Sequence, residues 1–170
     1  LQPDWQAVAP GVEHAAMRAR SRRGPVLINA LRVDPKHPAV AIDMRAATGA
    51  LTGLKPLAEQ FQPGRDIAGV NATFYRIREP YFGLPVGLHI RDGRIITGPQ
   101  LNRSVLGITR TGEVKMDRVQ LDARLRLADG TVIPLDNINQ WHPSEGLAGQ
   151  VMLYTPDWGE KAPKAPAGMM

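Results

Sequence analysis

The chain has 170 residues, a formal net charge of +5 and no cysteine. The missing cysteines exclude disulfides, thiolate metal sites and a cysteine nucleophile. The length fits one domain, and 17 Gly with 15 Pro favour turns over long helices. No stretch approaches the roughly 18 apolar residues that a membrane span needs, so we expect no membrane span.

Two strands are predicted near the start, over 11–20 and 25–34, joined by the polar turn Ser21-Arg-Arg-Gly24. In the second strand, apolar residues occupy both alternating sets of positions, which indicates a strand covered on both faces. A third strand is expected over 39–45, after a proline-containing loop.

One amphipathic helix follows. Thr52 is its expected cap, and Pro63-Gly64 is its expected end. Its apolar residues fall at the i, i+3, i+4 and i+7 spacing of one helix face: Leu54, Leu57, Ala58 and Phe61.

The segment 68–75 runs from small and apolar residues into the polar Asn71 and then into two aromatic residues. Such a continuous apolar approach predicts a buried strand. A buried amide left unpaired costs about 1–3 kcal/mol. Asn71 is therefore expected either to brace neighbouring backbone or to face a site.

The second half of the chain is predicted to form hairpins around Asp92-Gly93, Thr111-Gly112 and Asp129-Gly130. Residues 119–127 alternate between apolar and polar, as in a strand with one buried face. The predicted fold class is α+β: a strand-rich mixed or antiparallel sheet with one or two short helices. We expect a single domain over 1–160 and a flexible tail over 161–170.

Charge and motifs exclude several functions. The basic cluster over 18–23 is interpreted as a solvated strand end, and no nucleic-acid partner is predicted, because no aromatic platform or reading helix accompanies it. The sequence lacks a Gly-x-Gly-x-x-Gly motif and a phosphate-binding glycine loop. No cofactor or metal is predicted, since the histidines share no metal-like spacing: His14, His37, His89 and His142.

Arg103 stands out because it directly precedes an apolar strand. A phosphodiester carries one negative charge on oxygens that suit the forked donor of arginine better than lysine. The alternative interpretation is a surface arginine paired with a nearby carboxylate.

Several segments resemble, in order, the phosphodiester glycosidase family, which includes the lysosomal uncovering enzyme. Gly69-Val-Asn-Ala-Thr-Phe-Tyr75 is similar to the family's Val-Asn-Gly-Gly-Phe-Phe element, with Ala72 and Thr73 in place of glycines. Pro85-Val-Gly87 and 103–107 then follow in the family's order. The family's later Gly-Gly-Gly-Pro-like turn, Arg-Thr-x-x-Gly strand and Asp-Gly-Gly-Gly-Ser-like loop do not occur here. We therefore expect this chain to correspond to the N-terminal half of such a domain, as a fragment or as a reduced homologue.

The resemblance implies an exported bacterial hydrolase, periplasmic or secreted, that cleaves a sugar–phosphate phosphodiester bond. Asn71 would orient the sugar or phosphate and Arg103 would pair with the phosphate, while His89 would carry a proton. A C-terminal half or a second copy would complete the site. The alternative is a non-catalytic envelope module that binds anionic glycans or a partner subunit. The residues expected to bind substrate are Thr73, Tyr75, His89 and Asn102.

Overall fold

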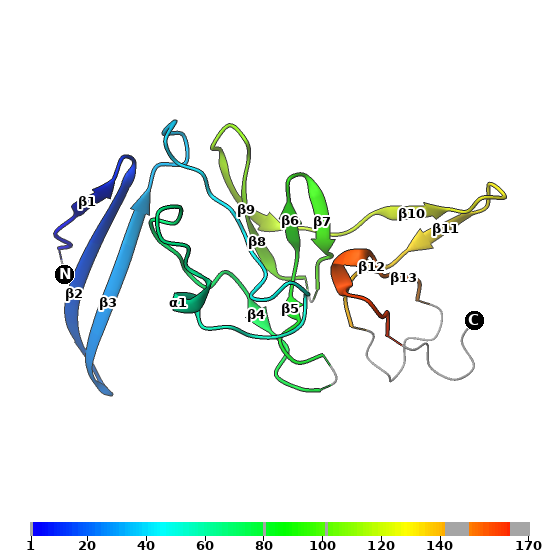
Figure 1. Ribbon diagram of the computed structural model, residues 1–170, viewed down its shortest axis with the longest axis horizontal. Coiled ribbons are helices and arrows are strands. Elements are labelled where there is room, and N and C mark those ends of the chain that lie inside the picture. The colour runs from blue at the N-terminus through cyan, green and yellow to red at the C-terminus, as the bar shows by residue number, and fades with distance from the viewer. Residues whose placement is uncertain (1, 80, 101, 142–149, 164–170) are drawn as a thin grey trace. The chain divides into compact units, whose positions relative to one another are not determined.

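The computed structural model describes residues 2–79, 81–100, 102–141 and 150–163 (Figure 1). Among these residues, the helices are the single turn α1 (Leu57–Gln60) and the 3-10 turn η1 (Pro156–Trp158), and strands account for most of the regular structure. The fold is therefore mostly β, and the predicted α+β class is wrong.

The predicted helix shrinks to one turn because its apolar face has little to pack against. Leu54, Leu57 and Phe61 are 43%, 40% and 42% exposed. Isolated helices shorter than about 12 residues are marginal without such packing. Thr52 does not cap the turn, since α1 begins only at Leu57, five residues further along the chain.

Residue contacts divide the chain into two units. The first comprises Leu1–Asp43, Phe61–Val70 and Leu106–Met116; the second comprises Met44–Gln60, Asn71–Val105 and Asp117–Met170. The single domain over 1–160 stays a prediction. Most of the predicted tail, residues 164–170, lies outside the described residues.

An antiparallel sheet of order β1-β2-β3 forms the start of the first unit (Figure 1). Its strands are β1 (Gln6–Ala9), β2 (Val12–Ser21) and β3 (Gly24–Val33). The predicted hairpin is confirmed, with Val12 opposite Val33 and Ser21 opposite Gly24. The expectation that both faces of the second strand are covered is wrong, because most of β3 is exposed. The strand expected over 39–45 is wrong as well, since those residues form no strand.

Local turn chemistry places the hairpins of the rest of the chain. Asp92 and Gly93 have φ of +53° and +75°, the left-handed pair that a two-residue hairpin turn needs. The predicted hairpins around Asp92-Gly93, Thr111-Gly112 and Asp129-Gly130 are confirmed. Their strands are β6 (His89–Arg91) with β7 (Arg94–Thr97), β8 (Ser104–Ile108) with β9 (Val114–Arg118), and β10 (Ala123–Arg126) with β11 (Val132–Leu135).

The second unit also contains two short strand pairs. β4 (Phe74–Tyr75) lies antiparallel to β5 (Pro85–Val86), and β12 (Asn137–Ile138) lies parallel to β13 (Met152–Leu153). The core of this unit is a cluster around the ring of Trp158, against which the rings of Tyr81, Trp141 and Tyr154 pack. Its buried members are Leu51, Leu84, Ile96 and Trp158.

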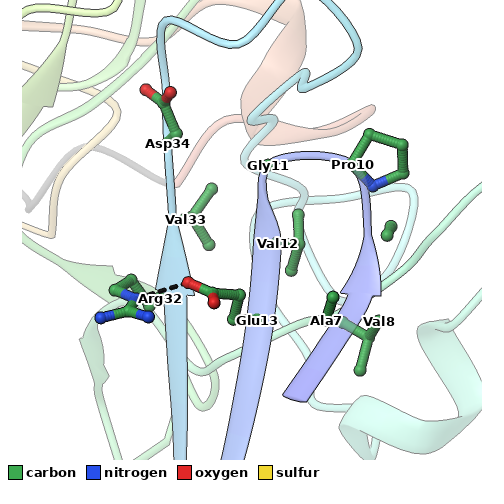
Figure 2. A pocket seen from close by; sticks show the side chains of 10 residues that line it. Ala7, Val8, Pro10, Gly11, Val12, Glu13, Arg32, Val33 and Asp34 are labelled. Carbon is green, nitrogen blue, oxygen red and sulfur yellow. Dashed lines mark hydrogen bonds and ion pairs between the residues drawn. The ribbon is translucent and has the colours of Figure 1, made fainter. Parts of the chain in front are cut away.

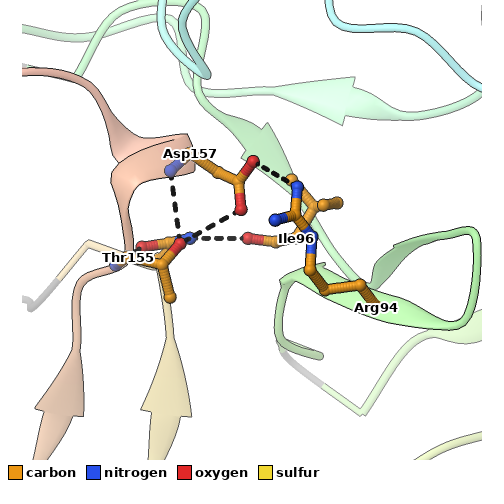
Figure 3. A network of polar contacts seen from close by, with 5 residues as sticks. Arg94, Ile96, Thr155 and Asp157 are labelled. Carbon is orange, nitrogen blue, oxygen red and sulfur yellow. Dashed lines mark hydrogen bonds and ion pairs between the residues drawn. The ribbon is translucent and has the colours of Figure 1, made fainter.

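A buried amide braces this core. Asn139 is fully buried, and its Nδ2 donates to the Ile96 carbonyl at 2.8 Å and to the Thr155 Oγ1 at 2.6 Å. Its Oδ1 accepts from the Thr155 backbone N–H at 2.8 Å. At the edge of this network, Arg94 forms an ion pair of 2.9 Å with Asp157 (Figure 3). The brace ties β7 to the turn η1.

Candidate functional site

Arg103 contacts the strand that follows Asn71. Its Cζ lies 5.2 Å from the centre of the Phe74 ring, within the range of a cation–π interaction. The backbone N–H of Arg103 donates to the Gln100 carbonyl at 3.3 Å, and Asn102 adopts a φ of +48° in the same turn. Among the described residues, no carboxylate lies within ion-pair distance of Arg103. That finding argues against the alternative of a surface arginine paired with a carboxylate.

The chain leading to Arg103 is fixed at Gly98. Its N–H donates to the Ile138 carbonyl at 2.8 Å, and the Asn137 Nδ2 donates to the Pro99 carbonyl at 2.8 Å. A Cβ at Gly98 would collide with the Asn137 Oδ1, so a larger residue would displace this amide. The turn that carries Arg103 therefore starts from an anchored backbone.

Asn71 lies in an irregular, exposed segment, and the strand begins only at Phe74. Val70 and Phe74 are 76% and 72% exposed. The predicted buried strand over 68–75 is therefore wrong, because these apolar side chains are not covered by an opposing layer of described residues. The exposed Asn71 amide can reach a ligand without any buried group having to move.

Thr73 and Tyr75 flank Phe74 and help to hold β4 in place. The Thr73 hydroxyl donates to the Val86 carbonyl at 3.2 Å, which adds a contact to the β4–β5 pair. Tyr75 is 45% exposed, and its ring meets the Phe82 ring edge-on at 6.3 Å. Both predicted residues are chain neighbours of Phe74, but successive side chains of a strand point to opposite faces, so the Tyr75 ring lies on the face opposite the ring that Arg103 contacts.

A buried polar network supports the backbone next to Thr73. The Gly87 carbonyl accepts from the Thr97 hydroxyl at 2.8 Å and from the Gln140 Nε2 at 3.3 Å. Gln140 also donates to the Gly98 carbonyl at 2.9 Å. Thr97 and Gln140 are fully or almost fully buried. The Gln140 amide thus binds the segment after β5, which lies beside Thr73, and the segment after β7, which leads to Arg103.

Sequence reasoning missed Phe74 and Gln140. The contact between Phe74 and Arg103 joins distant parts of the chain and has no local signature. The sequence did contain a signal for the network, however. Three of the four residues 137–140 are amides, and the same stretch contains Ile138 and is followed by Trp141. Amides at such density are typical of a buried network, since each needs a partner when water is excluded.

His89 lies in β6 opposite Thr97 and is 6% exposed. A ring at this depth is shielded from bulk solvent, and its role as a proton carrier stays a prediction. His142 lies outside the described residues.

A hollow of about 680 Å³ over the β1–β2 turn carries none of the predicted site residues (Figure 2). Its charged groups are already engaged. Arg32 Nε donates to Glu13 Oε2 at 2.5 Å, and this contact lowers the pKa of Glu13. Asp34 accepts from the Lys36 backbone N–H at 3.0 Å. These partnered charges do not point to a binding site.

Two absences hold for the described part of the chain. Within it, no three His, Asp or Glu side chains are grouped so that they could hold a metal ion. No helix there is long and apolar enough to cross a membrane.

Taken together, the arrangement suits recognition of a single negative charge. An arginine fork lies over an aromatic ring, and an exposed amide precedes that ring by three residues. A phosphate oxygen can accept two parallel N–H bonds from such a fork.

The fold defines a mostly β protein built from short hairpins. No family model and no curated protein matches the chain. The structure is similar to the crystal structure of a hypothetical protein from Synechocystis, with a TM-score of 0.70 and 21% identity. The match covers 88% of this chain and 27% of that chain, so this chain spans about a quarter of its solved neighbour. At this identity the similarity shows the fold alone.

Proposed function

We propose that Arg103 and Asn71 form the phosphate-binding part of a phosphodiester glycosidase, a hydrolase that cleaves a sugar–phosphate phosphodiester bond. The observation that carries the proposal is the Arg103 guanidinium over Phe74, with no carboxylate at ion-pair distance among the described residues. An arginine held on a ring, and not neutralised by a carboxylate, keeps its full charge for an anionic ligand.

The backbone beside Thr73 and the backbone before Arg103 are both held by hydrogen bonds, which supports a role in binding an anion. Gln140 holds the carbonyls of Gly87 and Gly98, which fixes the segments beside Thr73 and before Arg103. Binding costs less free energy when the contacting groups are already ordered. Asn102, next to Arg103 in the same turn, would then contact the sugar or the second ester group, while Thr73 would help to hold β4 in place.

A further polypeptide segment or a second copy of the chain would complete the site and supply the groups that break the bond. The surface around the proposed site supports this step, because Phe74, Tyr75 and Ile77 are 72%, 45% and 73% exposed. Large apolar side chains gathered on one short segment mark an interaction surface more often than a solvated one.

The alternative function is a non-catalytic envelope module that binds anionic glycans. The openness of the Asn71 segment favours it, since sites that bind and convert small substrates are mostly enclosed clefts. The same two residues would then bind the anion without turnover.

The test is sugar release from a panel of sugar 1-phosphodiesters, combined with calorimetric binding of the same compounds. The variants are Arg103→Ala and Asn71→Ala, and Arg110→Ala is the matched exposed arginine on the β8–β9 turn. Turnover that is lost in the first two variants only would support the hydrolase. Binding without turnover, weakened by the same two variants, would support the module. Binding that none of the variants changes would overturn both proposals.

A further inference from the structure

The tip of the β2–β3 hairpin carries a dense positive charge that carboxylates do not offset. No Asp or Glu occurs anywhere between His14 and Val33. The ion pair of this hairpin, between Arg32 and Glu13, lies at its opposite end. Four arginines cluster at the tip, all exposed and none in an ion pair with a described residue: Arg18, Arg20, Arg22 and Arg23.

Exposed aliphatic side chains lie directly beside these charges. Arg18 is paired with Leu27 across the hairpin, and residues paired in this way share a face of the sheet. Leu27 is 64% exposed. On the other face, Val26 and Ile28 are 39% and 36% exposed. The hairpin therefore combines cationic and aliphatic groups at one end.

We propose that this hairpin tip docks on the surface of an anionic lipid bilayer. Arginines attract acidic headgroups, while aliphatic side chains enter the boundary between headgroups and acyl chains. A lipid surface is the partner that uses both features. A nucleic acid fits less well, because residues 12–33 contain no Phe, Tyr or Trp on which a base could stack. A soluble polyanion would leave Leu27 without a role.

The first experiment measures binding of the full chain to vesicles by sedimentation. One set contains phosphatidylcholine alone, and the other contains equal parts of phosphatidylcholine and phosphatidylglycerol. We expect binding only to the second set, weakening as salt is added. Each arginine near an anionic surface contributes about fivefold to the partition coefficient, so Arg22→Gln with Arg23→Gln should lower it about 25-fold.

The matched control is Arg124→Gln with Arg126→Gln. These residues are exposed on β10, in the β10–β11 hairpin. The double substitution removes the same charge as Arg22→Gln with Arg23→Gln. The proposal predicts vesicle binding close to that of the unaltered chain for this control. An equal loss in both pairs would mean that net charge alone drives binding, and it would overturn the proposal.

The second experiment separates a lipid surface from a soluble polyanion. Leu27→Gln should lower vesicle binding about fivefold, because it removes apolar area from the lipid contact. It should leave binding to inorganic polyphosphate unchanged. Leu106→Gln, at a side chain that is 59% exposed on β8, is the control. If Leu27→Gln has no effect on vesicles, or if a short DNA duplex binds more tightly than the vesicles, the proposal is wrong. Circular dichroism would verify that each variant keeps its β structure.

Discussion

The Arg103 guanidinium carbon lies 5.2 Å from the centre of the Phe74 ring, which brings the start of β8 to β4. The contact orients a cation at an exposed edge of the second unit. It links Arg103 to the segment containing Asn71, as the proposed phosphate site requires.

Arg103→Ala should weaken binding of a sugar 1-phosphodiester about 10-fold to 100-fold, since hydrogen bonds to charged groups contribute about 1.5–3 kcal/mol. Arg103→Lys should recover only part of this loss, because lysine keeps the charge but not the forked geometry. Isothermal calorimetry gives the dissociation constants. Full recovery by lysine would contradict recognition through a fork and leave only an attraction between charges.

Gly83→Ala should destabilise the second unit more than Gly130→Ala does. Both glycines have a left-handed φ, +85° and +88°, so each substitution carries about 1–2 kcal/mol of backbone strain. A Cβ at Gly83 would additionally lie 2.5 Å from the Gly53 backbone nitrogen, whereas nothing lies within 4 Å at Gly130. We expect about 3 kcal/mol or more for Gly83→Ala, from urea unfolding. Equal losses would show that the two backbone segments do not approach this closely.

Asn139→Ala should cost about 2–4 kcal/mol of unfolding free energy, because the Thr155 N–H and the Ile96 carbonyl lose their buried partner. Arg94→Gln should cost about 1 kcal/mol or less, since the Arg94 side chain is 64% exposed in its ion pair with Asp157. Asn139→Gly separates the lost hydrogen bonds from the strain at φ +48°. A larger effect from Arg94→Gln than from Asn139→Ala would contradict the role given to the buried amide.

Tyr154 should make stability depend on alkaline pH. Burial, with a smaller effect from neighbouring Tyr81, raises the pKa of Tyr154 from 10.0 to about 12. The folded state therefore holds this proton more tightly than the unfolded state. Its contribution to stability is complete below about pH 10 and is lost as pH rises through about 12.

Unfolding free energies of the chain and of Tyr154→Phe across this range would check the effect. The variant should show a shallower decline between about pH 10 and about pH 12. Identical slopes in the two proteins would contradict it. Phenolate absorbance should show the Tyr154 phenol titrating above the usual pKa of a tyrosine.

The parts of the fold that the sequence predicts are those decided by local chemistry. Asp92-Gly93 adopts the two-residue turn expected of such a pair, and Asp129-Gly130 closes a hairpin with a left-handed φ at Gly130 but not at Asp129. Of the alternating strand predicted over 119–127, residues 123–126 form β10 and alternate between part-covered and exposed. The errors arise where a second layer was assumed. The 68–75 segment and β3 are apolar enough for burial, but the described residues leave most of their side chains exposed by a third or more.

The candidate site likewise contains residues that the sequence identifies and contacts that it does not. Arg103 and Asn71 could be singled out from their positions beside apolar runs and from the family resemblance. The ring under Arg103 and the Gln140 bonds to two separate carbonyls depend on contacts between distant residues. Spacing along the chain does not encode such contacts, so they could not be predicted.

The most direct test of the central claim is a nuclear magnetic resonance titration of the chain with an alkyl sugar 1-phosphodiester, observing the arginine Nε–H and the side-chain amide signals. The proposed site predicts that the Arg103 Nε–H and the Asn71 amide shift together and saturate with one affinity, and that Arg103→Ala abolishes the Asn71 shift. Signals that shift only on the arginines of the β2–β3 hairpin, or none that shift at all, would contradict a phosphate site at Arg103.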